Sequence, residues 1–136
     1  MRISILGGGP AGLYCGLLLK KSHPAHEVRI IERNAPDATY GWGVVFSDRT
    51  LAAFQEADYT SYKAITSRFV LWEAIDTYYR GELIRCGGHV FAGLARKTLL
   101  GILQERCREL GVALEFSTEV ASLDALGAAD LIIAAD

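Results

Sequence analysis

The sequence predicts an α/β fold that opens with a parallel strand–helix–strand unit. Three features support this prediction. Arg2–Leu6 is a short β-rich run that ends in glycines, Pro10–Lys21 carries leucines on one helical face, and Val28–Glu32 is a second β-rich run. Pro10 falls in the first helical turn, where its missing N–H group costs nothing. Together the three elements span the length that a βαβ unit requires, so we expect a Rossmann-like βαβ domain.

The segment after this unit departs from a simple strand–helix alternation. Ser47 or Asp48 can cap a short helix that ends near Ala57. Phe69–Tyr79 and Glu82–Cys86 have the composition of two strands separated by a tight turn. We therefore expect a β-hairpin inserted into the α/β domain.

The last third of the chain returns to helix and strand. Gly87–His89 is expected to form a flexible break, and His89 within it is a candidate for contact with a substrate. Arg96–Leu110 is the clearest helix, and the glycine that follows it suits a left-handed C-terminal cap. Val112–Ser117 and Asp130–Ala134 are expected to form further strands.

Composition excludes several classes of protein. The 136 residues suit one domain, 51% are hydrophobic, and 14 basic against 16 acidic residues give a net charge of −2. This balance argues against nucleic-acid binding, and no apolar run approaches the roughly 20 residues of a membrane helix. The three cysteines form no Cys-x-x-Cys pair, so we expect neither a disulfide framework nor a metal site. We expect reduced, mostly packed thiols in a cytoplasmic protein.

A glycine loop lies between the first strand and the first helix. Gly7-x-Gly9-x-x-Gly12 has the spacing that lets a dinucleotide approach the backbone, and Glu32 ends the next strand. Gly7 permits a tight turn, Gly9 leaves room for a pyrophosphate, and Gly12 allows close packing of helix on strand. The helix N-terminus attracts the pyrophosphate, and Glu32 can accept hydrogen bonds from a ribose diol. The pattern therefore predicts a dinucleotide site.

Glu32 also bears on which dinucleotide is bound. A carboxylate at this position would repel a 2′-phosphate, which disfavours NADP. The loop alone leaves FAD and NAD open. A standard NAD-binding fold would continue with a helix and a parallel strand after Glu32, whereas this sequence continues with a loop that contains Trp42 and with the hairpin.

Five segments of the chain together point to a known family: Ile5–Gly12, Glu32-Arg33, Gly41–Asp48, Gly87–His89 and Arg96–Leu100. They resemble the single-component FAD-dependent aromatic hydroxylases, with the nearest likeness to the salicylyl-CoA and anthraniloyl-CoA monooxygenases. The glycine loop is generic to many flavoproteins. Gly41–Val45 and the helix that opens at Arg96 are more specific to this family.

The resemblance implies FAD as cofactor and NAD(P)H as co-substrate. NAD(P)H would reduce the flavin, and O2 would supply the oxygen atom transferred to a small aromatic substrate, such as an aromatic acyl-CoA. In this reading the glycine loop contacts the pyrophosphate, Glu32 holds the adenosine ribose and Arg33 lies near the adenine. The Gly43–Val45 backbone passes beside the flavin ring, and Arg96 approaches the ribityl or phosphate part. The implied cofactor-binding residues are Gly7, Gly9, Pro10, Ala11, Gly12, Glu32, Arg33, Gly43, Val44, Val45 and Arg96. No catalytic residue is assigned.

Family members continue beyond the position of Asp136 with a second FAD-binding motif and a substrate-binding sheet. We therefore expect residues 1–136 to be the N-terminal part of an FAD-binding domain, incomplete at the C-terminus, with the substrate domain absent from this chain and little activity of its own. Two alternatives stay open. One is the domain of an NAD-dependent oxidoreductase, and the other is a non-catalytic dinucleotide-binding fragment.

Overall fold

The computed structural model describes the backbone of residues 1–136 and every side chain except that of His89, so the candidate role of His89 lies outside the described residues. The chain divides into two compact units. The first unit consists of Met1–Gly41 and Arg96–Asp136, and the second of Trp42–Ala95. The second unit is thus an insertion in the first along the chain.

A four-stranded parallel sheet forms the centre of the first unit. Its strands lie in the order β6-β2-β1-β7. They are β1 (Arg2–Leu6), β2 (Glu27–Ile31), β6 (Ala113–Glu115) and β7 (Leu131–Ala134). Numbered within the first unit alone, this order is that of the first four strands of a Rossmann sheet, 3-2-1-4. The predicted Rossmann-like fold is confirmed.

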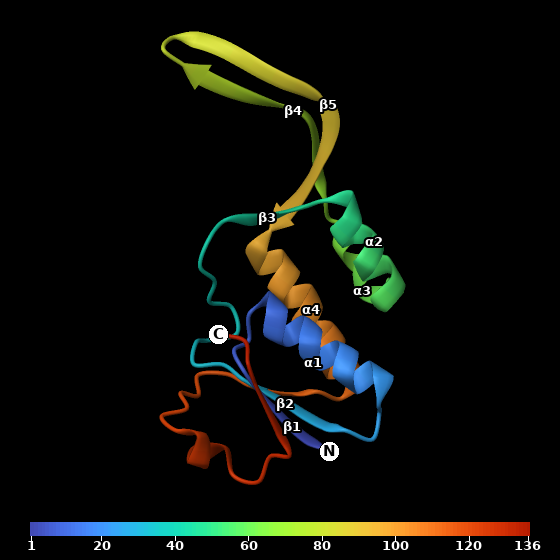
Figure 1. The fold of residues 1–136 in the computed structure, drawn as a ribbon, viewed down its shortest axis with the longest axis vertical. Coiled ribbons are helices and arrows are strands. Elements are labelled where there is room, and N and C mark those ends of the chain that lie inside the picture. The colour runs from blue at the N-terminus through green and yellow to red at the C-terminus, as the bar shows by residue number, and fades with distance from the viewer. The chain divides into compact units, whose positions relative to one another are not determined.

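Helices α1 (Pro10–Ser22) and α4 (Arg96–Leu110) pack side by side in the first unit (Figure 1). Leu17 of α1 and Leu103 of α4 are completely buried. A Cβ on Gly16 would lie 2.7 Å from Cδ1 of Ile30, so α1 lies close against β2 at this point. A short 3-10 helix, η1 (Leu123–Leu126), precedes β7. Among the described residues, no helix combines the length and apolar character needed to cross a membrane.

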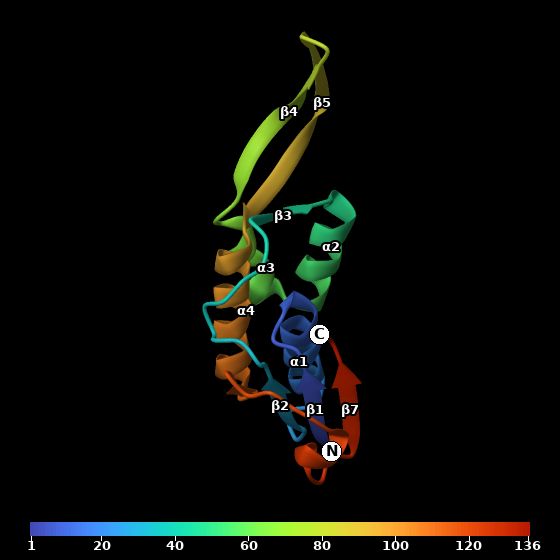
Figure 2. The same ribbon diagram turned by 90° about the vertical axis from the view of Figure 1, so that its left-hand side faces the viewer.

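The second unit is an antiparallel sheet with two helices. Its strands lie in the order β3-β5-β4. Its elements are β3 (Gly43–Phe46), α2 (Asp48–Ala57), α3 (Tyr59–Thr66), β4 (Val70–Tyr79) and β5 (Glu82–Ala95). Strands β4 and β5 form the predicted hairpin, which appears in Figure 2 as a long ribbon. Phe46 is buried against the rings of Phe54 and Phe69, and these three form a small aromatic core.

The helix predicted from Ser47 is confirmed as α2. The Ser47 hydroxyl accepts a hydrogen bond from the Thr50 backbone N–H at 3.2 Å, as an N-cap residue does. Helix α3 was not predicted. It begins after Asp58, whose carboxylate accepts the Ser61 N–H at 3.1 Å.

The flexible break predicted at Gly87–His89 is wrong, because β5 runs without interruption from Glu82 to Ala95. Gly88 has a φ of +90°, which a glycine adopts without strain. The register of β4 against β5 shifts between Trp72 and Ala74, which is an irregularity of the kind that bends a strand without ending it. The glycines therefore bend the strand rather than end it.

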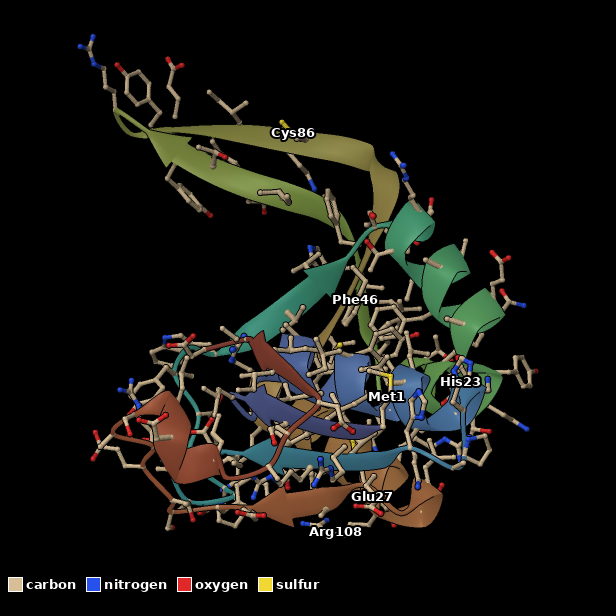
Figure 3. All side chains as sticks on the ribbon, turned by 60° about the horizontal axis from the view of Figure 1, so that its bottom comes forward. Met1, His23, Glu27, Phe46, Cys86 and Arg108 are labelled. Atoms are coloured by element: carbon tan, nitrogen blue, oxygen red, sulfur yellow. The ribbon has the colours of Figure 1, made fainter. Side chains whose placement is uncertain are left out.

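The cysteines are all free thiols, but they differ in exposure. Cys107 is buried and Cys15 is half-buried, whereas Cys86 is exposed on the hairpin (Figure 3). The prediction of mostly packed thiols therefore holds for Cys107 and Cys15, and Cys86, on the two-stranded ribbon, is the exception.

Candidate functional site

The glycine loop makes a tight connection between β1 and α1. Gly7 has a φ of +108°, and its N–H donates to the carbonyl oxygen of Ile31 at 2.9 Å. A Cβ on Gly7 would lie 2.6 Å from the carbonyl oxygen of Ala135, and one on Gly12 would lie 2.0 Å from the carbonyl oxygen of Gly7. Both positions therefore require glycine for the loop to pass between β7 and the first turn of α1.

The N-terminus of α1 is open to a ligand. Gly9 is the N-cap residue, and no side chain among those described caps this end of the helix. A Cβ on Gly9 would meet nothing within 4 Å, in contrast to Gly7 and Gly12. Unpaired N–H groups and the helix dipole favour an anion at such an end. Gly9 thus borders free space where a phosphate could approach the backbone.

A cavity of about 470 Å³ lies at the carboxyl ends of β1, β2 and β7, and we call it the strand-end cavity. It is lined by Leu6, Gly7, Gly9, Pro10, Ala11, Ile31–Asn34, Tyr40, Arg96, Thr118–Val120, Ala135 and Asp136. In open α/β sheets, ligands bind outside the carboxyl ends of the strands where the strand order reverses. Here the chain places β2 on one side of β1 and β7 on the other, so the cavity lies at that position.

Glu32 is held by hydrogen bonds from two sides. Its Oε2 accepts the Gly8 backbone N–H at 2.7 Å, and its Oε1 accepts the backbone N–H and side-chain Nδ2 of Asn34 at 2.8 and 2.6 Å. Burial raises the pKa of Glu32, but the hydrogen bonds from Asn34 and Gly8 oppose this, and the net pKa lies below the usual value. Glu32 is therefore an anion at neutral pH.

A smaller cavity of about 70 Å³, which we call the inner cavity, shares Gly9, Glu32 and Arg96 with the strand-end cavity. Arg96 begins α4, and its Nε is buried without a hydrogen-bond partner in the described part of the chain. The buried Oγ1 of Thr39, which also lines the inner cavity, likewise has none there. Buried polar atoms are normally paired, so a ligand or water at this position would satisfy them.

The structure brings most of the predicted site residues together. Gly7, Gly9, Pro10, Ala11, Glu32, Arg33 and Arg96 line the strand-end cavity, and Gly12 packs directly behind the loop. Gly43, Val44 and Val45 lie in the second unit, on β3, where they pair with Ala95, Leu94 and Gly93 of β5.

Sequence reasoning missed Asn34, Tyr40 and Thr118–Val120, which also line the strand-end cavity. Asn34 and Thr118 follow β2 and β6 and lie at the same edge of the sheet as the glycine loop. The rule that ligands bind at the carboxyl ends of parallel strands could have pointed to both segments.

A third cavity, of about 530 Å³, lies at the other end of the sheet. The basic side chains that line it already have partners within the protein. Arg2 pairs with Asp130 at 2.9 Å, Arg29 donates to the Ser4 hydroxyl at 2.9 Å, and Lys20 donates to the carbonyl oxygens of Pro24 and His26. The strand-end cavity is the better ligand site, because it has the uncapped N-terminus of α1 and the buried Arg96 Nε that lacks a partner among the described residues. Among the described residues, no group of three or more His, Cys, Asp or Glu side chains could hold a metal ion.

Comparison with known families decides which dinucleotide this geometry serves. The profile of the family described as "FAD binding domain" matches residues 1–129. The chain belongs to this FAD-binding domain family. FAD is therefore the cofactor of this domain, and the next question is whether the glycine loop, Glu32 and Arg96 suit it.

Two curated relatives cover the whole chain. A salicyloyl-CoA 5-hydroxylase from Streptomyces sp. is 43% identical over 136 residues, which are 26% of its length. A 3-hydroxy-4-methyl-anthranilyl-[aryl-carrier protein] 5-monooxygenase from Streptosporangium sibiricum is 31% identical over 136 residues, which are 38% of its length. The chain thus spans less than two fifths of the length of these relatives, and it resembles the hydroxylases that the sequence motifs indicated.

The fold is also found among solved structures. The tetrameric form of 2-methyl-3-hydroxypyridine-5-carboxylic acid oxygenase matches with a TM-score of 0.79 and 22% identity, over 96% of this chain and 38% of that one. At 22% identity, this match shows that the two proteins share a fold.

The argument against NAD drawn from chain order is wrong. We expected an NAD-binding fold to place a helix and a parallel strand after Glu32, and α4 and β6 do supply them, after the inserted second unit. The choice of FAD therefore rests on family membership rather than on the apparent loss of a Rossmann element.

Proposed function

We propose that the strand-end cavity binds the ADP half of FAD. The pyrophosphate would lie beside Gly9 at the N-terminus of α1, with Pro10 and Ala11 next to it, and Glu32 would accept a hydrogen bond from the adenosine ribose. The support is the free space at Gly9, the open helix end and the anionic Glu32 at one edge of one sheet. Arg33, which is exposed and lines the cavity, would contact the adenine.

Arg96 would hold the pyrophosphate or the ribityl chain. Its buried Nε has no partner among the described residues, and an arginine binds phosphate through two parallel N–H groups. The backbone of Gly43–Val45 would pass beside the flavin ring. This last assignment is supported by family resemblance alone.

We propose that the protein that carries this domain is a flavin-dependent monooxygenase that hydroxylates an aromatic substrate with NAD(P)H and O2. FAD, when bound, supplies the redox chemistry. The residues of this chain bind it, orient it and balance the charge of its pyrophosphate. Residues 1–136 would form part of the FAD-binding domain, with the substrate held by another domain. The names of the two relatives favour an aromatic acyl group carried on CoA or on a carrier protein.

FAD binding is tested by titration of the protein with FAD, followed by flavin fluorescence and visible absorbance. The wild type should bind FAD, and Arg96→Ala should bind it at least tenfold more weakly, since a hydrogen bond to a charged group contributes roughly 1.5–3 kcal/mol. Lys97→Ala is the matched control. Lys97 has the same charge and is the next residue of α4, but it is exposed and pairs only at 3.5 Å with Asp37. Equal loss in both variants, or binding of NADH without FAD, would overturn the assignment.

The activity is tested with the whole protein that carries this domain, loaded with FAD, together with NADH or NADPH and salicyloyl-CoA as a probe. Consumption of NAD(P)H coupled to a hydroxylated product, with little turnover of free salicylate, would support an acyl thioester substrate. Turnover of free salicylate at the same rate would support an aromatic acid instead. FAD binding without any turnover of aromatic probes would favour a non-catalytic dinucleotide-binding role.

We also propose a cytoplasmic location. The buried Cys107 packs as a thiol, and its Sγ donates to the carbonyl oxygen of Leu13 at 3.3 Å, an arrangement suited to a reducing compartment. Fractionation of cells that express the protein would test this.

A further inference from the structure

Asn34 holds Glu32 more firmly than any other residue at the site. Two of its N–H groups, one from the backbone and one from the side chain, donate to the same oxygen of Glu32, Oε1, at 2.8 and 2.6 Å. The Gly8 N–H takes one position on the other oxygen, Oε2, at 2.7 Å. Asn34 and Glu32 both line the strand-end and inner cavities. The carboxylate is thus fixed by its own loop before any ligand is bound.

The hydrogen-bond capacity of Glu32 is nearly used. An ionised carboxylate has about four acceptor positions, two on each oxygen. Asn34 fills both positions on Oε1, and Gly8 fills one on Oε2, so one acceptor position is left on Oε2. A carboxylate in this state accepts one hydroxyl, not both hydroxyls of a ribose diol.

Asn34 is itself anchored. Its backbone carbonyl oxygen accepts the Ser117 N–H at 3.0 Å, and its side-chain Oδ1 lies 3.4 Å from the Tyr40 hydroxyl. Because the first of these bonds is made by the backbone, replacement of the Asn34 side chain leaves it in place. The carboxamide can therefore be removed without loss of the connection between the loops that follow β2 and β6.

We propose that Asn34 is a positioning residue for the adenosine ribose. It occupies Oε1 of Glu32, so that the carboxylate presents only Oε2 to the ligand and binds a single hydroxyl of the ribose. This inference rests on the proposed function, because it needs FAD in the strand-end cavity. Asn34 thereby limits Glu32 to one hydroxyl of the ribose.

A double-mutant cycle tests the proposal by FAD titration of the wild type, Asn34→Ala, Glu32→Ala and the double variant. Asn34→Ala should weaken FAD binding about tenfold, and the double variant should bind no more weakly than Glu32→Ala, because Asn34 acts through Glu32. Independent, additive losses would overturn the proposal, as would wild-type affinity in Asn34→Ala. Failure of the wild type to bind FAD would overturn the proposed function and this inference together.

Two further variants separate positioning from folding. Asn34→Asp keeps the shape of the side chain but places a second carboxylate where a donor lay 2.6 Å from Oε1, so it should lose more affinity than Asn34→Ala. Asp37→Ala is the matched control from the same loop, since Asp37 is exposed and does not line either cavity. It should bind FAD as the wild type does. If all the variants melt at the same temperature as the wild type, a difference in FAD affinity reflects binding and not loss of the fold.

FAD analogues that lack the 2′- or the 3′-hydroxyl of the adenosine ribose test the single-hydroxyl claim. For one analogue, Glu32→Ala should cause no further loss of affinity relative to the wild type, because the hydroxyl that Glu32 binds is absent. For the other analogue, Glu32→Ala should cause its full loss. A partial dependence on Glu32 for both analogues would mean that both hydroxyls are bound, and would overturn the proposal.

Discussion

A Cβ atom on Gly12 would lie 2.0 Å from the carbonyl oxygen of Gly7. The backbone of the glycine loop therefore lies directly against the first turn of α1, and no side chain fits between them. Gly12→Ala should destabilise the fold by roughly 1–3 kcal/mol or more, the cost of forcing extra atoms into a packed region. Urea denaturation followed by circular dichroism would measure the loss.

Gly101 provides the control for this prediction. It lies within α4, and a Cβ there would meet nothing within 4 Å. Gly101→Ala should stabilise the protein by up to about 1 kcal/mol, because alanine is the better helix former. The two glycine-to-alanine changes should thus have opposite signs. Equal stability of Gly12→Ala and the wild type would show that the loop can move away from α1.

Gly9→Val should remove FAD binding and leave the fold intact. A Cβ on Gly9 meets open space, and its φ of −71° is accessible to any residue, so the folded chain can accommodate the valine. The same side chain would fill the place proposed for the pyrophosphate. Flavin absorbance after dialysis against FAD, and the far-ultraviolet circular dichroism spectrum, would check the two halves of this prediction. Normal flavin content in Gly9→Val would contradict the placement of the pyrophosphate.

The Arg2–Asp130 pair predicts a pH dependence of stability. The Arg2 backbone N–H and Nη2 both donate to the Asp130 carboxylate, at 2.7 and 2.9 Å, and tie the start of β1 to the start of β7. The side-chain hydrogen bond from Arg2, with the backbone bond, lowers the pKa of Asp130 to about 2. A group whose native pKa lies below its unfolded value stabilises the fold above that unfolded value. Its contribution is lost as the pH falls through the native pKa.

Asp130→Asn tests this dependence, because it removes the charge but keeps an acceptor. The wild type should melt at a higher temperature than the variant at pH 6. The difference should narrow as the pH falls below the usual aspartate value of 3.8, and it should vanish only below the native pKa of about 2. A difference that stays constant from pH 6 to pH 2 would show that the charge of Asp130 does not stabilise the fold.

Local sequence patterns predicted the first unit well. Strand β1 and helix α4 begin and end where the sequence placed them, α1 ends one residue later, and β2 is shifted by one residue at each end. A glycine or proline stands at one end of β1, α1 and α4, so these ends are encoded locally. The second unit was predicted less well, since β3 exists only through its pairing with β5, which is distant in the sequence.

The residues of the candidate site also differ in how well the sequence predicts them. Gly7, Gly9, Gly12 and Glu32 could be predicted as site residues because their spacing reflects one continuous βαβ unit. The strand-end rule points to the segment that contains Asn34, but no spacing motif marks its two hydrogen bonds to Glu32. The loops after β2 and β6 come together only in the folded sheet, where the Asn34 carbonyl oxygen accepts the Ser117 N–H.

The three cysteines should react with thiol reagents in a fixed order. Cys86 is exposed and should react first, and Cys15 should follow slowly, because burial raises its pKa. Burial raises the pKa of Cys107 to about 12, and its thiol donates to Leu13, so this residue should react only on unfolding. Alkylation at pH 8 followed by peptide mass spectrometry would give the order, and Cys86→Ser should remove the fast phase. Rapid alkylation of Cys107 in the native protein would contradict the close packing of α4 on α1, since its Sγ lies between them.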